Sequence, residues 1–368
     1  MAKAEETVLE IDLQALDHNY RYLRSKLRPE TKFMAVVKAY AYGSDSVAIA
    51  KRLEHLGADY FAVAYVNEGI TLREGGITAP ILVLHPQKVH FKTLIENHLE
   101  PSIYSKAILS GFIATAKELG ETDYPIQLKF NTGLNRLGFS ASELLEVSTL
   151  IQQQSAVKVT ALLSHLAATE DANEIDFTTL QLQRFNTICK KADTLFKNRT
   201  LKHVLNTSGI INYAQAQYDM VRSGIGLYGY GNQPEIDTEL RPVMTLKTII
   251  SQKHIIEKGE SVGYNRKYKS DYKTVTATLP LGHADGIGRE YGRGKTYVLI
   301  HGKLAPIIGN VCMDMIMVDV TNIECEEGDE VEIFGKNLSA NQFAETAQTI
   351  TYEILTGLSQ RIKRVLIN

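Results

Sequence analysis

The chain has 368 residues, of which 44% are hydrophobic and 22% charged, and its formal net charge is −2. Such a length suits one large domain plus a second, and the near-neutral charge gives no basis for nucleic-acid binding. No apolar stretch is long enough to cross a membrane, the N-terminus lacks a signal-peptide core, and the three isolated cysteines show no metal-binding spacing, so we expect a cytoplasmic protein without a metal site.

The first part of the chain alternates short apolar runs with amphipathic helical segments. Val8–Asp12 reads as a strand, and about residues 13–27 read as a helix. Eight further strands are predicted near residues 33–37, 59–63, 80–84, 100–103, 126–130, 159–164, 202–205 and 219–222. Helical patterns between them include Ser46–Leu56, Lys106–Leu119, Ala141–Gln152 and Phe177–Phe196. Eight strand–helix units predict a (β/α)₈ barrel of the TIM type. An open doubly wound sheet is the alternative, although no GxGxxG follows the first strand.

The pattern changes after about residue 232, where a polar, proline-bearing linker extends to residue 242. The runs beyond it are rich in strand-forming residues: Met244–Ile256, Thr274–Leu281, Lys295–Ile300, Ala305–Ile308, Met315–Val320 and Glu330–Phe334. A helix is expected at about Ala340–Thr356. The sequence therefore predicts a barrel domain at residues 1–235 and a mainly antiparallel β domain at residues 236–368. The first strand, within residues 1–12, is a candidate for packing on the second domain.

Lys38 follows directly on the apolar run Phe33–Val37, which suits a strand buried on both faces. A buried ammonium is costly unless it is paired or neutralised. A lysine with a lowered pKa becomes a nucleophile toward carbonyl compounds, including pyridoxal 5′-phosphate (PLP). The alternative is an exposed lysine just past a core strand.

Other polar residues also fall at predicted strand ends, where a barrel places its working groups. They are Lys129, Arg136, Ser164, His165, Asn206, Thr207 and Arg222. The backbone amides of Gly224 and Ile225, together with the Thr207 hydroxyl, could cradle a phosphate. Taken singly, each has a structural alternative, such as a tight turn for the glycines or a satisfied core residue for the histidine.

In the second domain, Tyr264 lies between predicted strands and could act as an acid or base if nearby cations lowered its pKa. A surface tyrosine is the alternative. Asp314 lies in an apolar run and requires a hydrogen-bond partner there.

As a set, these motifs resemble alanine racemase, a PLP-dependent enzyme with a barrel and a C-terminal β domain. The matching segments span both domains in the family's order: Val37–Gly43, Lys129–Gly138, Ser164–His165, Asn206–Ser208, Val221–Ile225 with Leu227–Gly229, Ser261–Tyr264, Gly309–Asp314 and Thr351–Glu353. The resemblance implies an isomerase that interconverts L- and D-alanine in a homodimer and supplies D-alanine for peptidoglycan.

The resemblance also implies residue roles. Lys38 would bind PLP covalently and act as one base, and Tyr264 would reach the partner subunit's barrel as the opposite base. Arg222 would face the pyridine nitrogen, and His165 would support the ring. The phosphate would be held by the residues Tyr42, Thr207, Gly224, Ile225 and Tyr352, and Asn206 would be a further cofactor-binding residue.

The substrate carboxylate would contact Arg136 and the Met313 backbone, and Arg136 would also contact the cofactor's phenolic oxygen. Cys312 and Asp314 would support the site. Lys129 corresponds to a lysine that is often carbamylated in this family and positions the arginine.

Four positions depart from the family pattern: Thr207 replaces the usual serine, Asn131 an aspartate, Asn135 a common glycine, and His283 a tyrosine near the substrate entrance. These departures concern substrate range and access more than the reaction. A serine or broad-specificity racemase of the same fold is the second hypothesis. A fold-type-III decarboxylase is less favoured, because Cys312 and Asp314 are not adjacent. A non-catalytic PLP carrier would need only the barrel, which leaves the residues after the linker unexplained.

Overall fold

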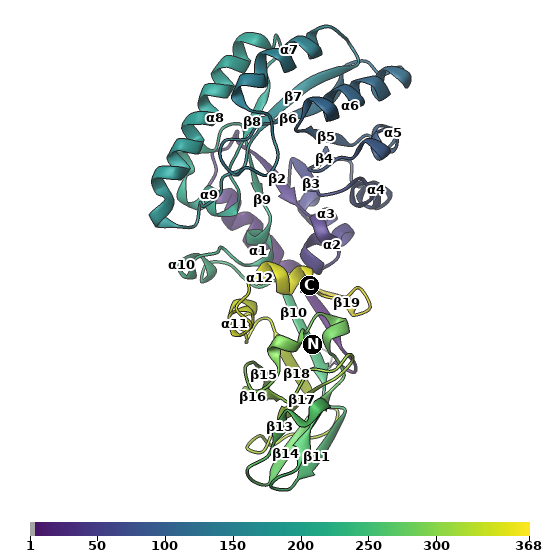
Figure 1. Ribbon diagram of the computed structural model, residues 1–368, viewed down its shortest axis with the longest axis vertical. Helices are drawn as coiled ribbons and strands as arrows, with labels where there is room; N and C mark the ends of the chain where they lie inside the picture. The colour runs from purple at the N-terminus through teal and green to yellow at the C-terminus, as the bar shows by residue number, and fades with distance from the viewer. Residues whose placement is uncertain (1–3) are drawn as a thin grey trace.

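The computed structural model describes residues 4–368 and places a barrel and a β-sheet domain along one long axis (Figure 1). Eight parallel strands close the barrel in chain order, and β9 pairs with β2 to complete it. They are β2 (Lys32–Val36), β3 (Tyr60–Val63), β4 (Ile81–Val83), β5 (Glu100–Ile103), β6 (Tyr124–Lys129), β7 (Val157–Leu163), β8 (Leu201–His203) and β9 (Met220–Ser223). The predicted barrel is confirmed, and the open sheet is excluded.

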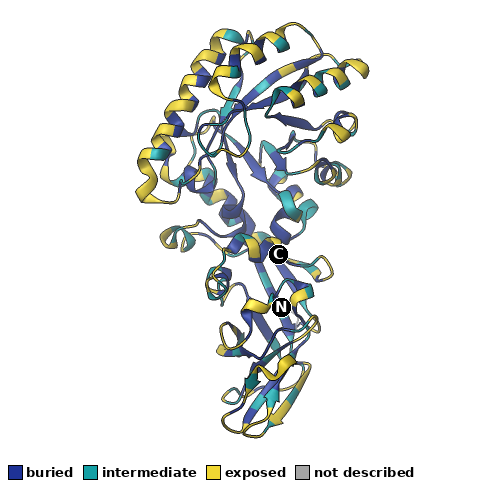
Figure 2. Cartoon of the chain, in the orientation of Figure 1, coloured by how far each residue is buried: buried dark blue, intermediate teal, exposed yellow. Residues whose placement is uncertain are grey.

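Helices surround the barrel strands, as their apolar spacing predicts. They include α1 (Leu13–Ser25), α3 (Ser46–His55), α4 (Val66–Glu74), α5 (Phe91–Glu96), α6 (Lys106–Glu118), α7 (Leu144–Gln152), α8 (Ile175–Leu195) and α9 (Thr207–Asn212). In α8 the buried residues Gln181, Phe185, Ile188 and Ala192 recur every three or four positions. Figure 2 shows the result as buried strands inside and exposed outer helix faces. Within residues 4–368, no helix is long and apolar enough to span a bilayer.

The strand β1 (Val8–Asp12) lies outside the barrel. It pairs in parallel with β19 (Lys363–Ile367) and antiparallel with β10 (Met244–Ile249). Leu9 and Ile11 are fully buried in this arrangement. Residues 1–3 of the segment considered for this packing lie outside the described residues. The start of the chain is therefore part of the sheet that carries the second domain.

The second domain is built on a nine-stranded sheet in the order β11-β14-β17-β16-β15-β18-β10-β1-β19. The strands not yet given are β11 (Gln252–Ile256), β14 (Thr274–Leu279), β15 (Tyr297–Ile300), β16 (Lys303–Ile308), β17 (Ile316–Asp319) and β18 (Glu330–Phe334). Within residues 4–368, its neighbouring strands pair antiparallel except β1 with β19, which are parallel. A separate two-stranded hairpin joins β12 (Ser261–Val262) to β13 (Tyr268–Lys269).

The structure adds detail to one sequence expectation for this domain and corrects another. The run Met244–Ile256 forms two strands, β10 and β11, which pair with different neighbours. The expected helix at Ala340–Thr356 is two short helices, α11 (Ala340–Thr346) and α12 (Thr351–Thr356). Gln348 has φ +58° between them, and such a left-handed residue cannot continue a right-handed helix.

Candidate active site

A cavity of about 720 Å³ opens at the carboxyl ends of the barrel strands. It brings together every site residue predicted in the barrel: Lys38, Tyr42, Lys129, Arg136, His165, Asn206, Thr207, Arg222, Gly224 and Ile225. Tyr352 reaches the same cavity from α12, which lies between the barrel and the sheet domain (Figure 1). The cavity therefore unites residues from strand ends that lie far apart in the sequence.

Lys38 opens a strained turn, α2 (Lys38–Gly43), in which Ala39–Tyr42 all have positive φ, between 52° and 57°. Left-handed backbone costs roughly 1–2 kcal/mol per residue, so its surroundings must hold it in place. Gly43 is required at the end, because a Cβ there would lie 1.9 Å from the Leu355 carbonyl oxygen.

The Glu68 carboxylate stabilises this turn from the neighbouring helix α4. Its Oε1 accepts from Ala39 N at 2.6 Å, and its Oε2 accepts from Ala64 N at 2.6 Å and Tyr65 N at 3.0 Å. One side chain thus ties the turn after β2 to the loop after β3. Charge-assisted bonds of this kind are about twice as strong as neutral ones.

The two lysines in the cavity have lowered pKa values. Burial is the main cause for Lys38, the Arg136 cation adds to it, and the Glu68 carboxylate opposes it. Burial and the nearby cations Arg136, Arg222 and Lys38 lower the pKa of Lys129 to about 8. Both amines are therefore available in neutral form more readily than ordinary lysines.

Arg222 is only 4% exposed, and several hydrogen-bond acceptors hold its guanidinium in place. Nη2 donates to the Ser164 carbonyl at 2.7 Å and lies 3.3 Å from His165 Nδ1, while Nη1 lies 2.6 Å from His203 Nδ1. Burial and the adjacent cations hold the pKa of His165 and that of His203 well below the ordinary value. Both rings are therefore neutral beside the guanidinium.

Gly224 lies where only a glycine fits. A Cβ at this position would lie 2.2 Å from the Tyr42 hydroxyl, and the Tyr42 ring is fixed by stacking on Tyr228 at 4.6 Å. The Thr207 hydroxyl accepts from Gly224 N at 3.3 Å and lies 3.0 Å from Ser223 Oγ. Hydroxyl groups and backbone amides converge here in the manner that suits a phosphate.

The charges around the cavity define the kind of ligand it suits. Four cationic side chains line it, namely Lys38, Lys129, Arg136 and Arg222, and no carboxylate is among its described lining residues. Buried cations require anionic partners. A ligand that carries a phosphate and a carbonyl group fits this set, because the amine of Lys38 can react with the carbonyl. The residues therefore fit PLP.

Of the predicted site residues in the second domain, Tyr352 reaches this cavity, whereas Tyr264, Cys312, Met313 and Asp314 do not. Tyr264 belongs to the short 3₁₀ segment η6 (Tyr264–Arg266) and is 69% exposed, and Met313 is 59% exposed. Cys312 and Asp314 flank Met313, and like Tyr264 and Met313 they are absent from the lining of the barrel cavity. Within a single chain, the two groups of predicted residues are separate.

The second group is nevertheless well ordered by its own contacts. The carbonyls of Cys312 and Met313 accept from His283 N at 2.9 Å and Ala284 N at 3.0 Å. Arg361 joins the same two loops, because it donates to Asp314 at 2.7 Å and to both carboxylate oxygens of Asp285. The loop that contains Met313 is thereby fixed.

Tyr264 is attached to this part of the domain through Asn310, whose side-chain amide donates to the Tyr264 carbonyl at 3.0 Å. Its ring extends from a turn in which Gly263 and Asn265 both have positive φ. The geometry presents an exposed phenol on an ordered turn.

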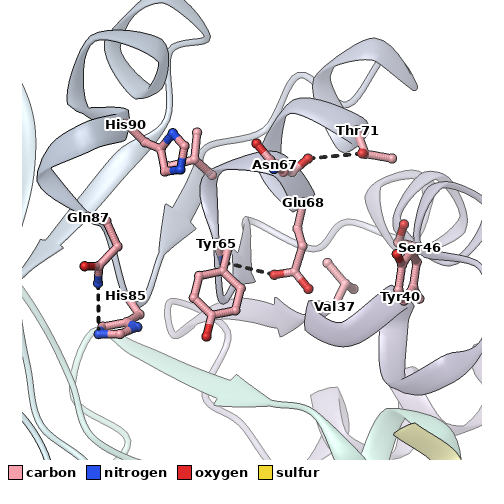
Figure 3. A pocket seen from close by; sticks show the side chains of 11 residues that line it. Val37, Tyr40, Ser46, Tyr65, Asn67, Glu68, Thr71, His85, Gln87 and His90 are labelled. Carbon is pink, nitrogen blue, oxygen red and sulfur yellow. Dashed lines mark hydrogen bonds between the residues drawn. The ribbon is translucent and has the colours of Figure 1, made fainter. Parts of the chain in front are cut away.

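Sequence reasoning missed several residues at the barrel site. Glu68 stands three residues after Tyr65 at capping-box spacing, a signal that could have marked it. Tyr65 and His85 line the main cavity and also a neighbouring pocket of about 530 Å³. Figure 3 shows Glu68 directed at Tyr65, and Gln87 paired with His85, in that pocket. His203, which contacts Arg222, lies in a strand without any motif.

Comparison with known proteins places both domains in one family. The chain matches the family "Alanine racemase, N-terminal domain" over residues 11–232 and "Alanine racemase, C-terminal domain" over residues 243–366. "Alanine racemase 2" of Caldanaerobacter subterraneus subsp. tengcongensis is 35% identical over 98% of this chain and 95% of its own.

Solved structures agree along the full length. Alanine racemase of Clostridium difficile 630 superposes with a TM-score of 0.93 at 33% identity, covering 100% of this chain and 97% of its own. The Bartonella henselae enzyme, crystallised with covalently bound pyridoxal phosphate, gives a TM-score of 0.89 at 28% identity, covering 99% and 100%.

Proposed function

Because the chain belongs to the alanine racemase family, we propose that it uses PLP to interconvert L-alanine and D-alanine. The family is PLP-dependent. The observation that carries the proposal is the carboxylate-free, cation-lined cavity around the amine of Lys38. When bound, PLP would withdraw electrons from the amino-acid Cα, so that its proton becomes removable.

Two bases are needed, one on each face of the Cα, so that a proton leaves one side and returns on the other. Lys38 is the first, since its lowered pKa favours the neutral amine that accepts a proton. We assign the second role to Tyr264 of the partner subunit. The support is that Tyr264 is exposed on an ordered turn and does not line the cavity of its own barrel.

The active unit on this proposal is a homodimer with shared sites. The Met313 backbone, from the same exposed group as Tyr264, would meet the substrate carboxylate together with Arg136. Cys312 and Asp314 support that loop, the latter through its bond to Arg361. D-Alanine made in this way would serve peptidoglycan synthesis.

Within the barrel, Arg222 would face the ring nitrogen of PLP, and neutral His165 would lie against the ring. Five residues would hold the phosphate: Tyr42, Thr207, Gly224, Ile225 and Tyr352. Asn206 lines the same cavity and would be a further cofactor-binding residue. We further propose that Lys129 is carbamylated, which would convert a cation among cations into an anion that orients Arg136.

A serine or broad-specificity racemase is the second candidate, because His283 and Thr207 depart from the family pattern. The alanine-specific and the broader activity are both compatible with the same cavity. A PLP carrier is the non-catalytic candidate.

The test is to purify the protein with PLP and to follow D-alanine formation from L-alanine, and the reverse, against L-serine as competitor. We expect equal amounts of both alanine enantiomers at equilibrium and a higher kcat/KM for alanine than for serine. Lys38→Ala should abolish both PLP attachment and turnover. Lys32→Ala, which removes a half-exposed lysine from β2, the strand that precedes Lys38, is the control and should retain activity. Faster serine turnover would favour the second candidate, and PLP binding without any turnover would favour the carrier.

A further inference from the structure

A chain of hydrogen bonds extends from Arg222 through the barrel interior, away from the cavity. His203 Nδ1 lies 2.6 Å from Arg222 Nη1, and His203 Nε2 lies 3.0 Å from Gln127 Oε1. Gln127 Nε2 then donates to Glu100 Oε2 at 2.7 Å. The four side chains come from β9, β8, β6 and β5, so the chain crosses the barrel from strand to strand.

All four side chains are buried. Gln127 and His203 are fully buried, Arg222 is 4% exposed and Glu100 is 7% exposed. Buried polar groups must find partners within the protein, because water cannot replace them. The direction of each bond in the chain is therefore constrained by its neighbours.

The direction can be followed from either end. A carboxylate only accepts, so Glu100 requires the amide nitrogen of Gln127 on its side. The amide oxygen then faces His203 Nε2, which must carry the imidazole proton. His203 Nδ1 is left with its lone pair, and this lone pair faces an N–H of Arg222, which only donates.

We infer that Glu100 is a positioning residue for Arg222, which acts through Gln127 to hold His203 in its Nε2–H tautomer. The opposite tautomer would set an N–H of His203 against an N–H of the guanidinium and displace Arg222 from the cavity. Burial raises the pKa of Glu100, and the Gln127 bond and the Arg73 cation offset part of that rise. Glu100 Oε2 is the acceptor in its bond with Gln127 Nε2. The role of Arg222 toward the cofactor rests on the proposed function, whereas the chain of bonds and the tautomer do not.

The amino-acid sequence alone does not reveal this series of hydrogen bonds. Glu100, Gln127 and His203 are widely separated, and each stands in a strand where a polar side chain carries no motif. Only closure of the barrel brings them together. Polar side chains buried inside the barrel cost stability unless they are fully hydrogen-bonded, and the positioning of Arg222 gives a reason for their presence.

The test is nitrogen-15 NMR of the histidine rings in the full-length protein, with the His203 signals assigned by their loss in His203→Gln. The native protein should show one tautomer, protonated at Nε2. Glu100→Gln replaces an acceptor with a group that also donates, so that the chain can run in both directions. We expect the ratio of the Nε2–H tautomer of His203 to its Nδ1–H tautomer to fall at least tenfold.

Glu100→Met removes the acceptor altogether and provides the second variant if Glu100→Gln proves unstable. The matched control is Glu332→Gln, since Glu332 is equally buried, at 7% exposed, but lies in β18 and bonds to Asn337 and Leu338. It should leave the His203 signals unchanged. An unchanged Nε2–H tautomer in both Glu100 variants would show that Arg222 alone sets the ring, and would overturn the inference. Because this readout needs no turnover, a failed racemisation assay would leave it intact.

Discussion

Arg222 places a positive charge beside two neutral histidines at the floor of the cavity. Burial lowers its pKa to about 10, which still leaves it protonated at neutral pH. An arginine at the ring nitrogen of PLP does not readily give up a proton. With PLP bound as proposed, Arg222 would therefore keep that nitrogen unprotonated, limit the lifetime of negative charge on the substrate, and so limit transamination.

Arg222→Glu should accordingly slow racemisation on the order of 100-fold, the scale of losing one charged stabilising group. It should also raise the share of turnovers that end in transamination. Both are measured by chromatography of alanine enantiomers and pyruvate. Arg199→Glu, at an exposed arginine paired with Asp219, is the control and should change neither. Unchanged partitioning in Arg222→Glu would contradict the role proposed for the guanidinium.

The proposed carbamylation of Lys129 should depend on pH. A carbamate forms from the neutral amine, and the pKa of Lys129 is about 8. The carbamate should therefore accumulate as the pH rises through about 8 and disappear as it falls. Carbon-13 NMR with labelled bicarbonate measures it directly. The signal should be absent in Lys129→Ala, and a native protein without it at any pH would rule out the modification.

Among individual residues, the sequence identified the chemically reactive side chains but not the residues that hold them in place. Lys38, Lys129 and Arg222 stood out because charged residues at apolar strand ends are costly and need a reason. Glu68 and His203 did not, because their partners are backbone amides and a guanidinium that only the folded chain brings near. Their roles depend on contacts, and contacts cannot be inferred from one strand.

Among the elements, the loop after β9 makes a steric demand directly at the proposed phosphate site. Gly224→Ala would place a methyl group 2.2 Å from the Tyr42 hydroxyl, and Tyr42 cannot yield because it stacks on Tyr228. We expect a loss of roughly 1–3 kcal/mol in the free energy of unfolding, typical of overpacking. PLP affinity should also fall at least tenfold.

Denaturant unfolding and a PLP titration provide the two measurements. Gly111→Ala is the matched control, because Gly111 lies within α6 and a Cβ there would lie 3.3 Å from its nearest atoms, Lys88 Cε and Phe91 Cε2, against 2.2 Å at Gly224. Alanine also stabilises helix interiors relative to glycine by about 0.5–1 kcal/mol. Equal stability and PLP affinity in the native protein and Gly224→Ala would show that the loop can move.

Elements with a repeated apolar pattern were predictable, and those that depend on a local break were not. α8 and the barrel strands follow from spacing alone. The separation of α11 from α12 depends on the left-handed Gln348, a residue type with no marked preference for that conformation. The final strand β19 was missed because its partner β1 lies at the other end of the chain.

At the scale of the whole molecule, the predicted site falls into two groups of residues. One lines the barrel cavity, and the other, with Tyr264 and Met313, is exposed on the β domain. On the proposed function, a second copy of the chain would complete the site. The sequence motifs indicated both groups, but the resemblance alone supplied the idea that they meet between subunits.

The most direct test combines two inactive variants in one dimer. Lys38→Ala and Tyr264→Phe chains, each with its own affinity tag, are co-expressed, and the dimer that carries both tags is isolated. If Tyr264 serves the partner's barrel, one of its two sites retains both bases, and the rate of D-alanine formation should be about half that of the native dimer. If Tyr264 serves its own barrel, or neither residue is a base, the mixed dimer will be no faster than the two inactive parents, and that result would contradict the shared two-base site.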